Sequence, residues 1–395
     1  MASQEVLREE PSRGSFINDP KVRSFVFQTV VVVLLVGGVY WIVNNVIDNL
    51  TRLHIASGFG FLRGRAGFDI SDSAIAYTSD STYGRAILVG IINTLIVAAV
   101  GIVTASIIGF FVGIGRLSHN WLIQKICTVY VEVFRNIPPL LVIFFWYSGV
   151  LAVLPTPKES IHLPFGSLLN QRGVYFPRAV WGDGSWLIFV AFLVGIAMAW
   201  FVARMARQRQ MATGQQFPVF WTSLALIVGL PVLAYALSGF PLSFDFPKQS
   251  TFNLTGGFVV KPEFLSLYLA LSFYTAAFIA EIVRAGIRGV ARGQSEASAA
   301  LGLRSGQALR LVVVPQAMRI VIPPLASQYL NLTKNSSLAI AIGYPDLTAT
   351  AGTVLNQTGQ AIECVLIMMT VYLSISLLTS LFMNWFNAKM ALVER

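Results

Sequence analysis

Long apolar runs, separated by shorter polar segments, dominate the chain. No charged residue occurs in 86–115, 136–157, 184–203, 210–244 or 364–388. Because a helix needs about 20 mostly apolar residues to cross the hydrocarbon core of a bilayer, each run predicts a membrane span. The first run after Phe25, the stretch 264–280 and the interrupted run 320–343 bring the expected number to eight. The spans are placed at about 25–46, 87–114, 132–154, 185–203, 219–238, 264–285, 320–343 and 364–386.

Composition supports an all-α, polytopic membrane protein. Of the 395 residues, 55% are hydrophobic and 12% are charged, and the mean hydropathy is +0.68. A soluble domain carries about 25% charge, and disordered or disulfide-stapled chains have fewer apolar residues or more cysteines. The two cysteines, Cys127 and Cys364, lie in apolar stretches and are expected to be small core residues. No metal site and no cofactor is therefore expected.

The basic residues predict the orientation. With both termini on the cytoplasmic side, 17 of the 28 Lys and Arg residues fall inside, 9 fall outside, and Arg135 and Lys334 lie within spans. Basic residues accumulate on the cytoplasmic side of membrane proteins, so both termini are expected there. The net charge of +10 has the same origin, and no nucleic-acid partner is expected. The first span has no A-x-A cleavage pattern and is expected to remain as an anchor.

The longest predicted cytoplasmic loop, 284–319, contains a candidate surface helix at 293–302. Ala297, Ala299 and Ala300 favour a helix, Ser295 is expected to cap its start, and Gly302 suits a left-handed stop. Glu296 complements the positive N-terminal end of such a helix. Small side chains allow another protein to approach closely, whereas an ordinary amphipathic connector remains the alternative.

This stretch resembles the E-A-A-x3-G-x9-I-x-L-P signature of permease subunits of bacterial ABC importers. Glu296, Ala297, Gly302 and Pro315 match, and Ser298, Val312 and Val314 are conservative departures. The resemblance implies that the loop 293–302 couples the chain to a separate ATPase, with Glu296, Ala297, Ala300 and Gly302 as contact residues.

Further motifs resemble the polar and general L-amino-acid importers of the histidine/glutamine type. They are Gly90–Leu95, Tyr130–Pro138, Tyr274–Arg284, Pro315–Arg319 and Lys334–Leu338. The full chain resembles the Q-type subunits of general L-amino-acid permeases from alpha-proteobacteria. A type I permease core of five helices is then implied, formed by the second, third, sixth, seventh and eighth spans.

That resemblance also implies a domain organisation and partners. A cytoplasmic segment 1–24 and an anchor helix with a periplasmic loop, 25–85, precede the permease domain 86–395, which carries an inserted two-helix segment at about 185–238. The implied partners are a second homologous permease in a heterodimer, two ABC ATPase subunits, a periplasmic amino-acid-binding protein and membrane lipid. The inserted helices are expected to be peripheral, and the location is the bacterial inner membrane.

The chain carries no catalytic motif of its own. No G-x-x-x-x-G-K-[ST] sequence occurs, so no phosphate-binding loop is available, and the three histidines lie in loops or at span edges. The chain is therefore expected not to be an enzyme.

Ionisable and polar residues inside spans are the candidates for the substrate pathway. Lys334, Asn335 and Ser336 form a polar helix break at membrane depth, which suits either amino-acid binding or bracing of the break. Glu281, with Arg284 one turn later, is interpreted as a brace or gate. Asn93, Thr94 and Tyr274 are further candidates, and Arg135 beside Pro138 and Pro139 marks a structural helix break.

The resulting hypothesis is a permease half that moves L-amino acids from a periplasmic binding protein into the cytoplasm. A secondary amino-acid transporter is one alternative, for which inverted repeats and an ion-coupling carboxylate would be expected. A membrane scaffold without transport is the other.

Overall fold

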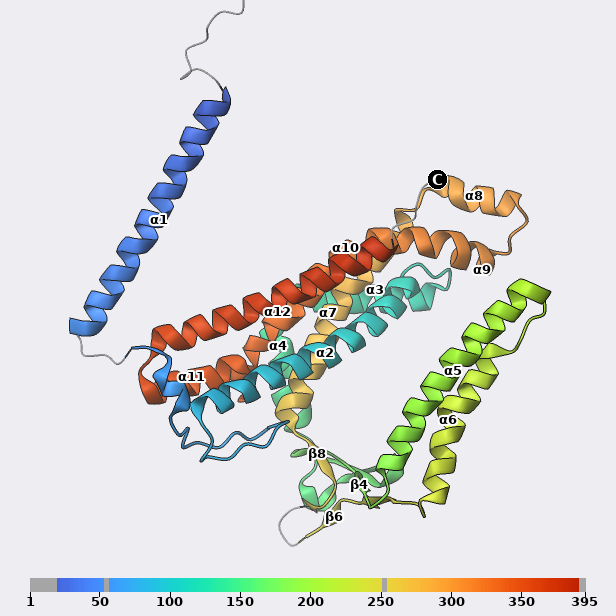
Figure 1. The fold of residues 1–395 in the computed structure, drawn as a ribbon, viewed down its shortest axis with the longest axis horizontal. Helices are drawn as coiled ribbons and strands as arrows, with labels where there is room; N and C mark the ends of the chain where they lie inside the picture. Colours follow the sequence, from blue (N-terminus) through green and yellow to red (C-terminus); the bar gives the residue numbers. More distant parts are fainter. Residues whose placement is uncertain (1–19, 53–56, 251–253, 391–395) are drawn as a thin grey trace, which may run out of the picture.

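The computed structural model describes residues 20–52, 57–250 and 254–390, which form a nearly all-helical protein (Figure 1). Most of the predicted segment 1–24, with Arg8 and Arg13, and the terminal Arg395 lie outside the described residues. The long helices are α1 (Pro20–Arg52), α2 (Tyr83–Gly115), α5 (Trp186–Thr213), α6 (Val219–Leu237), α7 (Pro262–Arg288), α10 (Val314–Asn335) and α12 (Ala361–Met390).

Within these described ranges, seven helical stretches are long and apolar enough to cross a membrane. The number reaches the predicted eight when one bent helix pair is counted as a single span. The seventh predicted span lies in a continuous stretch from Gly306 to Ile342. This stretch is built from α9 (Ser305–Ala308), the π-helix η6 (Leu309–Val313), α10 and the 3₁₀ helix η7 (Ser336–Ile342).

The third span differs from the straight helix predicted over 132–154. It consists of α3 (Trp121–Asn136), followed after a 111° bend by α4 (Pro139–Phe144) and the π-helix η3 (Phe145–Leu151). Ile137 is extended, with φ −102° and ψ 133°, because the ring of a following proline disfavours the α conformation. The break predicted beside Arg135 is therefore present. It is preceded by helix α3, most of which was not predicted.

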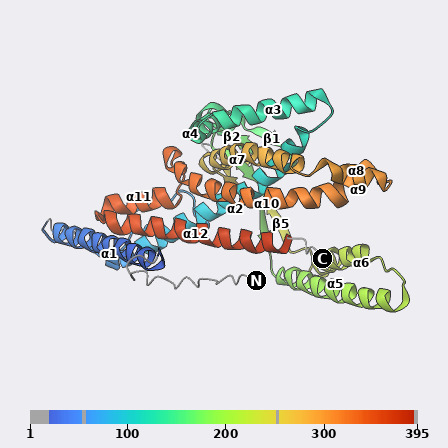
Figure 2. The same ribbon diagram turned by 90° about the horizontal axis from the view of Figure 1, so that it is seen from above.

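Helices α2 and α7 pack closely along each other in the centre of the bundle. Gly109 and Gly113 of α2 face Ile279, Ala280 and Val283 of α7, and a Cβ at Gly109 would lie 2.6 Å from Cβ of Ile279. Glycines at such positions bring helix backbones together where no water is available to drive association. Helix α10 packs on α7 and α12, and α3 and α4 pack on α7, which completes the bundle (Figure 2).

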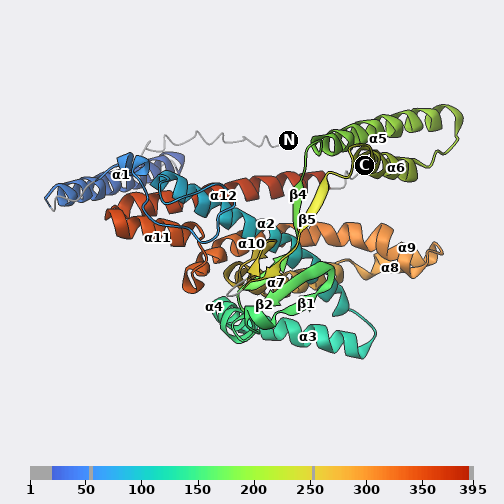
Figure 3. The same ribbon diagram turned by 90° about the horizontal axis from the view of Figure 1, so that it is seen from below.

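Helix α1 stands apart from this bundle (Figure 1), and so does the α5–α6 hairpin (Figures 1 and 3). No residue in the most apolar part of α1 is buried. Helices α5 and α6 pack mainly against each other, and Gly195 of α5 lies so close to Leu226 that a Cβ would be 2.6 Å from its carbonyl oxygen.

Short strands and helices at one end of the bundle were not predicted. Strands β1 (Ile161–Leu163), β2 (Ser167–Asn170), β3 (Gly173–Phe176) and β8 (Phe258–Val260) form an antiparallel sheet in that order. Two ribbons pair β4 (Arg178–Trp181) with β5 (Leu242–Asp245), and β6 (Lys248–Gln249) with β7 (Leu254–Thr255). The short helices η2 (Phe59–Arg63), η4 (Pro157–Glu159), η5 (Pro164–Gly166) and α11 (Leu347–Thr358) complete the elements.

The pairings β3–β8 and β4–β5 join the two sides of the α5–α6 hairpin at its base. Val174 pairs with Val260, and Trp181 pairs with Leu242. The chain between η3 and α7 therefore leaves the bundle and returns to it through the four-stranded sheet and the β4–β5 ribbon. We call this end of the bundle the strand end, and the opposite end, which carries α8 (Arg292–Ala300), the α8 end (Figure 1).

Candidate functional site

The predicted surface helix is present as α8, and its ending follows the expected geometry. Gly302 has φ +74°, its N–H donates to the carbonyl of Ala299 at 2.9 Å, and the N–H of Leu303 donates to that of Ser298 at 3.1 Å. These two bonds form a Schellman motif, which satisfies carbonyls that the helix leaves unpaired. The predicted cap at Ser295 is wrong, because α8 begins earlier, with Ala291 as the N-cap residue and no side-chain cap.

The small residues of α8 are exposed. Glu296, Ala297, Ala300 and Gly302 all lie on the surface, whereas Ser298 is buried and its hydroxyl donates to the carbonyl of Gln294. The exposed apolar side chains nearby are those of Leu301, Leu309, Leu311 and Val314. An exposed helix of small residues beside apolar side chains is a surface that a second protein can cover.

Side chains tie α8 to the bundle. The amide of Gln316 in α10 donates to the side-chain oxygen of Gln294 in α8 at 3.0 Å. Pro315 lies in the first turn of α10, directly after the π-helix η6, and its missing N–H removes one helical hydrogen bond there. The hydrogen bond between Gln316 and Gln294 links α8 directly to α10.

Glu281 lies at the centre of a charged cluster near the α8 end. Its carboxylate accepts from Arg116 and from Arg284, the latter at 2.9 Å, and Nη1 of Arg135 lies 3.9 Å away. Arg116 also lies 3.6 Å from Glu132, and it is only 7% exposed. The cluster joins the end of α2 to α3 and α7. Sequence reasoning found the Glu281–Arg284 pair from its i,i+3 spacing but not Arg116, which is 165 positions away from Glu281.

Asn93 and Thr94 are buried in α2 and hold backbone from the strand end. The Asn93 amide donates to the carbonyl of Asp72 at 2.8 Å and to that of Pro345 at 2.9 Å. The Thr94 hydroxyl accepts from the N–H of Leu347 at 3.0 Å. These bonds connect α2 to the segment before it and to the start of α11.

Lys334, Asn335 and Ser336 lie where α10 continues as η7. A helix break was predicted at this point, but the helix continues. The chain passes directly from α10 into a 3₁₀ helix that ends only at Gly343, with φ +77°. Lys334 is exposed, Ser336 is buried, and the Ser336 hydroxyl donates to the carbonyl of Thr333 at 2.7 Å. Tyr274 is half-buried on α7, with its ring 5.0 Å from that of Phe278.

A cavity of about 330 Å³ opens at the strand end. Its lining includes Asp72, Asn93, Lys261, Phe264 and Tyr344. The Lys261 ammonium donates to the carbonyl of Ser71, and burial raises the pKa of the Asp72 carboxyl, an effect that Lys261 opposes. A carboxylate and an ammonium thus share one cavity. Neither residue was predicted as a site residue, because both lie in segments that connect the spans. Of the predicted pathway residues, only Asn93 lines it.

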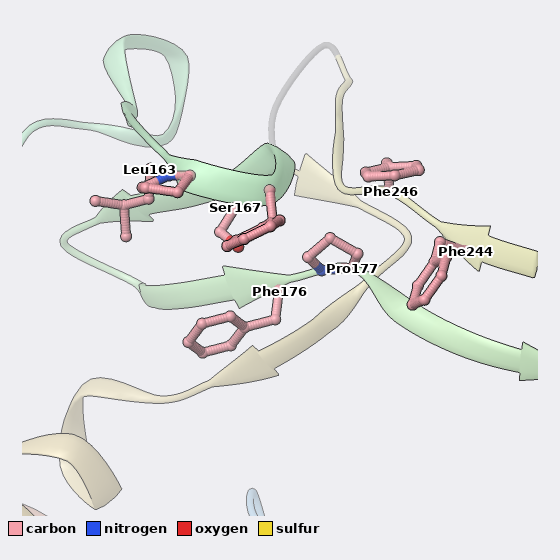
Figure 4. A pocket seen from close by; sticks show the side chains of 8 residues that line it. Leu163, Ser167, Phe176, Pro177, Phe244 and Phe246 are labelled. Atoms are coloured by element: carbon pink, nitrogen blue, oxygen red, sulfur yellow. The ribbon is translucent and has the colours of Figure 1, made fainter. Parts of the chain in front are cut away.

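A second, apolar cavity of about 570 Å³ lies between the sheet and the β4–β5 ribbon (Figure 4). The rings of Phe176, Phe244 and Phe246 surround Pro177 there. Phe165, which also lines it, is 91% exposed and has φ +58°. No group of three metal-ligating side chains occurs in the part of the chain that the structure describes.

A multi-span helical bundle with an exposed small-residue helix at one end has the form of a transport permease. The chain belongs to the family described as binding-protein-dependent transport system inner membrane components, which it matches over residues 195–392.

The chain is similar along almost its whole length to three curated proteins. It is 65% identical to the general L-amino acid transport system permease protein AapQ of Rhizobium johnstonii, over 96% of this chain and 95% of that protein. Identity is 50% to the putative amino-acid ABC transporter permease protein YhdX of Escherichia coli, over 96% and 97% of the two chains. It is 41% to the glutamate/glutamine/aspartate/asparagine transport system permease protein BztB of Rhodobacter capsulatus, over 98% and 100%.

Proposed function

We propose that the chain forms half of the membrane pathway of an ATP-driven importer of L-amino acids. The observation that carries this proposal is the 65% identity, along nearly the full chain, to a general L-amino acid permease. The exposed helix α8, linked to α10, supplies the contact that such a subunit needs with an ATPase.

The coupling site in this proposal is α8 with its Schellman ending. Glu296, Ala297 and Ala300 face outward, so an ATPase can approach the helix backbone closely. Movement of the ATPase then reaches α10 through Gln294 and Gln316. ATP hydrolysis belongs to the partner chain.

The α8 end is assigned to the cytoplasm, in agreement with the excess of basic residues on that side. Both termini are then cytoplasmic, and the strand end faces the periplasm. The proposed partners are a second homologous permease in a heterodimer, two ATPase subunits and a periplasmic amino-acid-binding protein that delivers substrate to the strand end.

The proposed division of the chain has an N-terminal segment 1–24, an anchor with its loop, 25–85, and a permease domain, 86–395. Residues 185–238 are an insertion into that domain, in keeping with the separation of α5 and α6 from the bundle. Within the bundle, Glu281 acts as a brace, since its carboxylate joins three helices.

The proposed substrate pathway passes Lys334, Asn335, Ser336 and Tyr274, with Asn93 and Thr94 supporting its outer mouth. An exposed lysine in a span is disfavoured against lipid by about 2.5–3.5 kcal/mol on insertion scales, so Lys334 is assigned to a hydrated face. Lys334→Met removes the charge and keeps the stem. We expect it to lower uptake while assembly and basal ATPase activity remain, measured in reconstituted proteoliposomes. Normal uptake by this variant would remove Lys334 from the pathway.

The proposed function is tested by co-expression of the chain with its three kinds of partner and reconstitution into liposomes. Uptake of labelled L-amino acids should require ATP inside the liposomes and binding protein outside. Uptake driven by a proton or sodium gradient without ATP would instead support a secondary transporter. Co-purification with the other subunits in the absence of any uptake would support a scaffold.

A further inference from the structure

The α5–α6 hairpin presents apolar faces that the rest of the described chain leaves uncovered. Apart from the β4–β5 ribbon at the base of the hairpin, α5 and α6 pack closely only against each other in the described chain. Its exposed large side chains include Phe189, Trp200, Phe220, Trp221 and Leu233. Within a membrane, such faces meet lipid acyl chains.

The charges of the hairpin are all positive and lie at one end. Residues 184–244 contain no Asp, Glu, Lys or His, and their three charged side chains are Arg204, Arg207 and Arg209. All three belong to the last part of α5, which points toward the same side as α8 in Figure 1. An anion that approaches this end of the hairpin meets no carboxylate on the hairpin itself.

One of these arginines lines an apolar groove between the last part of α5 and the loop that connects α5 to α6. The groove, of about 250 Å³, is lined by Val202, Met205, Ala206, Arg209 and Phe217, and we call it the α5–α6 groove. Nη2 of Arg209 donates to the side-chain oxygen of Gln215 at 3.1 Å. A guanidinium has five N–H donors in a planar fork that fits phosphate, so one such bond leaves donors for a ligand.

The other two arginines do not line the groove. The guanidinium of Arg204 lies over the ring of Trp200, 5.5 Å from its centroid. Arg207 lies two positions before Arg209, which on a helix places it on a different face. Arg207 is therefore a matched control for Arg209, with the same charge on the same helix and at nearly the same depth.

We propose that the α5–α6 groove is a binding site for an anionic phospholipid, with the headgroup phosphate on Arg209 and an acyl chain along Val202, Met205 and Phe217. One cation beside an apolar surface matches an amphiphile. A free anion makes no favourable contact with the apolar side chains, and a neutral acyl chain makes none with the guanidinium. Basic pockets between membrane helices bind anionic headgroups by this same chemistry. The site is independent of transport and of the proposed partners.

The test titrates the purified full-length chain in detergent with phosphatidylglycerol or phosphatidylcholine of identical acyl chains, and counts bound lipid by native mass spectrometry. We expect the first phosphatidylglycerol to bind about ten-fold more tightly than phosphatidylcholine, because the choline cation of phosphatidylcholine offsets the attraction between the phosphate, which both lipids carry, and Arg209. Arg209→Gln should abolish that preference, and Arg207→Gln should keep it. Arg209→Lys should keep part of it, because the charge remains without the planar fork.

A second variant tests the apolar surface of the groove without changing a charge. Met205 is 54% exposed, so Met205→Trp can fill the groove without disturbing the helix contact. It should weaken phosphatidylglycerol binding although all three arginines remain. Should either critical variant fail to fold, the other one still decides the question.

Four outcomes would overturn the site. The first is equal binding of phosphatidylglycerol and phosphatidylcholine by the unaltered chain, and the second is unchanged phosphatidylglycerol binding by both Arg209→Gln and Met205→Trp. The third is a loss of the lipid preference in Arg207→Gln equal to that in Arg209→Gln. The fourth is displacement of bound phosphatidylglycerol by millimolar inorganic phosphate. The third outcome would mean a diffuse surface charge, and the fourth a site for free anions.

Discussion

At the scale of single residues, the carboxylate of Glu281 has to balance a buried cation. Arg116 is 7% exposed, and Glu281 and Glu132 are the carboxylates near it in the described chain. A buried charge that loses its partner destabilises a protein much more than the pair stabilises it. The stability of the contact among α2, α3 and α7 therefore depends on ion pairs of Arg116 that no single helix can form alone.

Arg116→Gln and Glu281→Gln are expected to lower the melting temperature of the detergent-solubilised chain more than Arg284→Gln does. The reason is that Arg284 is 26% exposed and pairs within its own helix. The double variant Arg116→Gln/Glu281→Gln should be less destabilised than the sum of the single changes, with a coupling of about 1 kcal/mol or more. Strict additivity would show that the two groups act independently.

A second residue, Asp346, links stability to pH. Asp346 caps α11 by accepting from the N–H of Ala349 at 2.8 Å, and it is fully buried. Burial raises the pKa of its carboxyl from 3.8 to about 6, although hydrogen bonds from the backbone of Ala349 and Thr348 oppose this shift. The folded protein thus holds this proton more tightly than the unfolded chain does.

It follows that the protonated carboxyl stabilises the fold below pH 3.8, and that this stabilisation is lost as the pH rises through about 6. We expect the melting temperature to fall between those values, by an amount equivalent to at most roughly 3 kcal/mol. Asp346→Asn should reduce that dependence, since an amide still accepts from Ala349 and does not titrate. An unchanged pH profile in this variant would assign the dependence to another group.

At the scale of elements, prediction succeeded where one physical requirement dominates. A spanning helix needs a long apolar run, so the seven long apolar helices were recognised from the sequence. Helix α3 was missed because Lys125, Glu132 and Arg135 interrupt its apolar residues, and the strands were missed because they have two to four residues each. Val174 pairs with Val260, and the whole α5–α6 hairpin lies between them in the sequence. No local sequence pattern predicts such a distant pairing.

The ending of α8 offers an element-scale test of coupling. Gly302 has φ +74° with open space around it, so substitution acts through backbone strain and not through a clash. Gly302→Val should therefore disturb the Schellman ending by about 1–3 kcal/mol and uncouple ATP hydrolysis from uptake in proteoliposomes. Gly293→Val is the matched control, because Gly293 is also surrounded by open space and has no positive φ. Asparagine tolerates the left-handed conformation, so Gly302→Asn should retain uptake.

Normal coupling in Gly302→Val would remove the helix ending from the mechanism. Equal losses in Gly302→Val and Gly293→Val would mean that bulk on the α8 surface matters, and not the left-handed residue.

At the scale of the whole molecule, the two ends of the bundle have different construction. The strand end carries the sheet, the segment 57–82 and α11. Hydrogen bonds from the Asn93 side chain fasten this segment and the start of α11 to α2. The α8 end carries an exposed helix and the Glu281 cluster. A pathway that receives substrate at one end and an ATPase at the other requires such a difference, and it can be checked through the orientation of the chain in the membrane.

We expect single cysteines at exposed positions of the strand end to react with a membrane-impermeant maleimide applied to intact cells. Suitable substitutions are Ser73→Cys in the segment before α2 and Phe165→Cys beside the aromatic cavity, both exposed in the structure. Ala297→Cys and Ala300→Cys in α8 should react only after the inner membrane is opened, because the basic residues place that end inside. Background reaction is removed by first replacing Cys127 and Cys364, which are both free. Labelling of the α8 positions in intact cells would reverse the orientation, and α8 could then no longer contact a cytoplasmic ATPase.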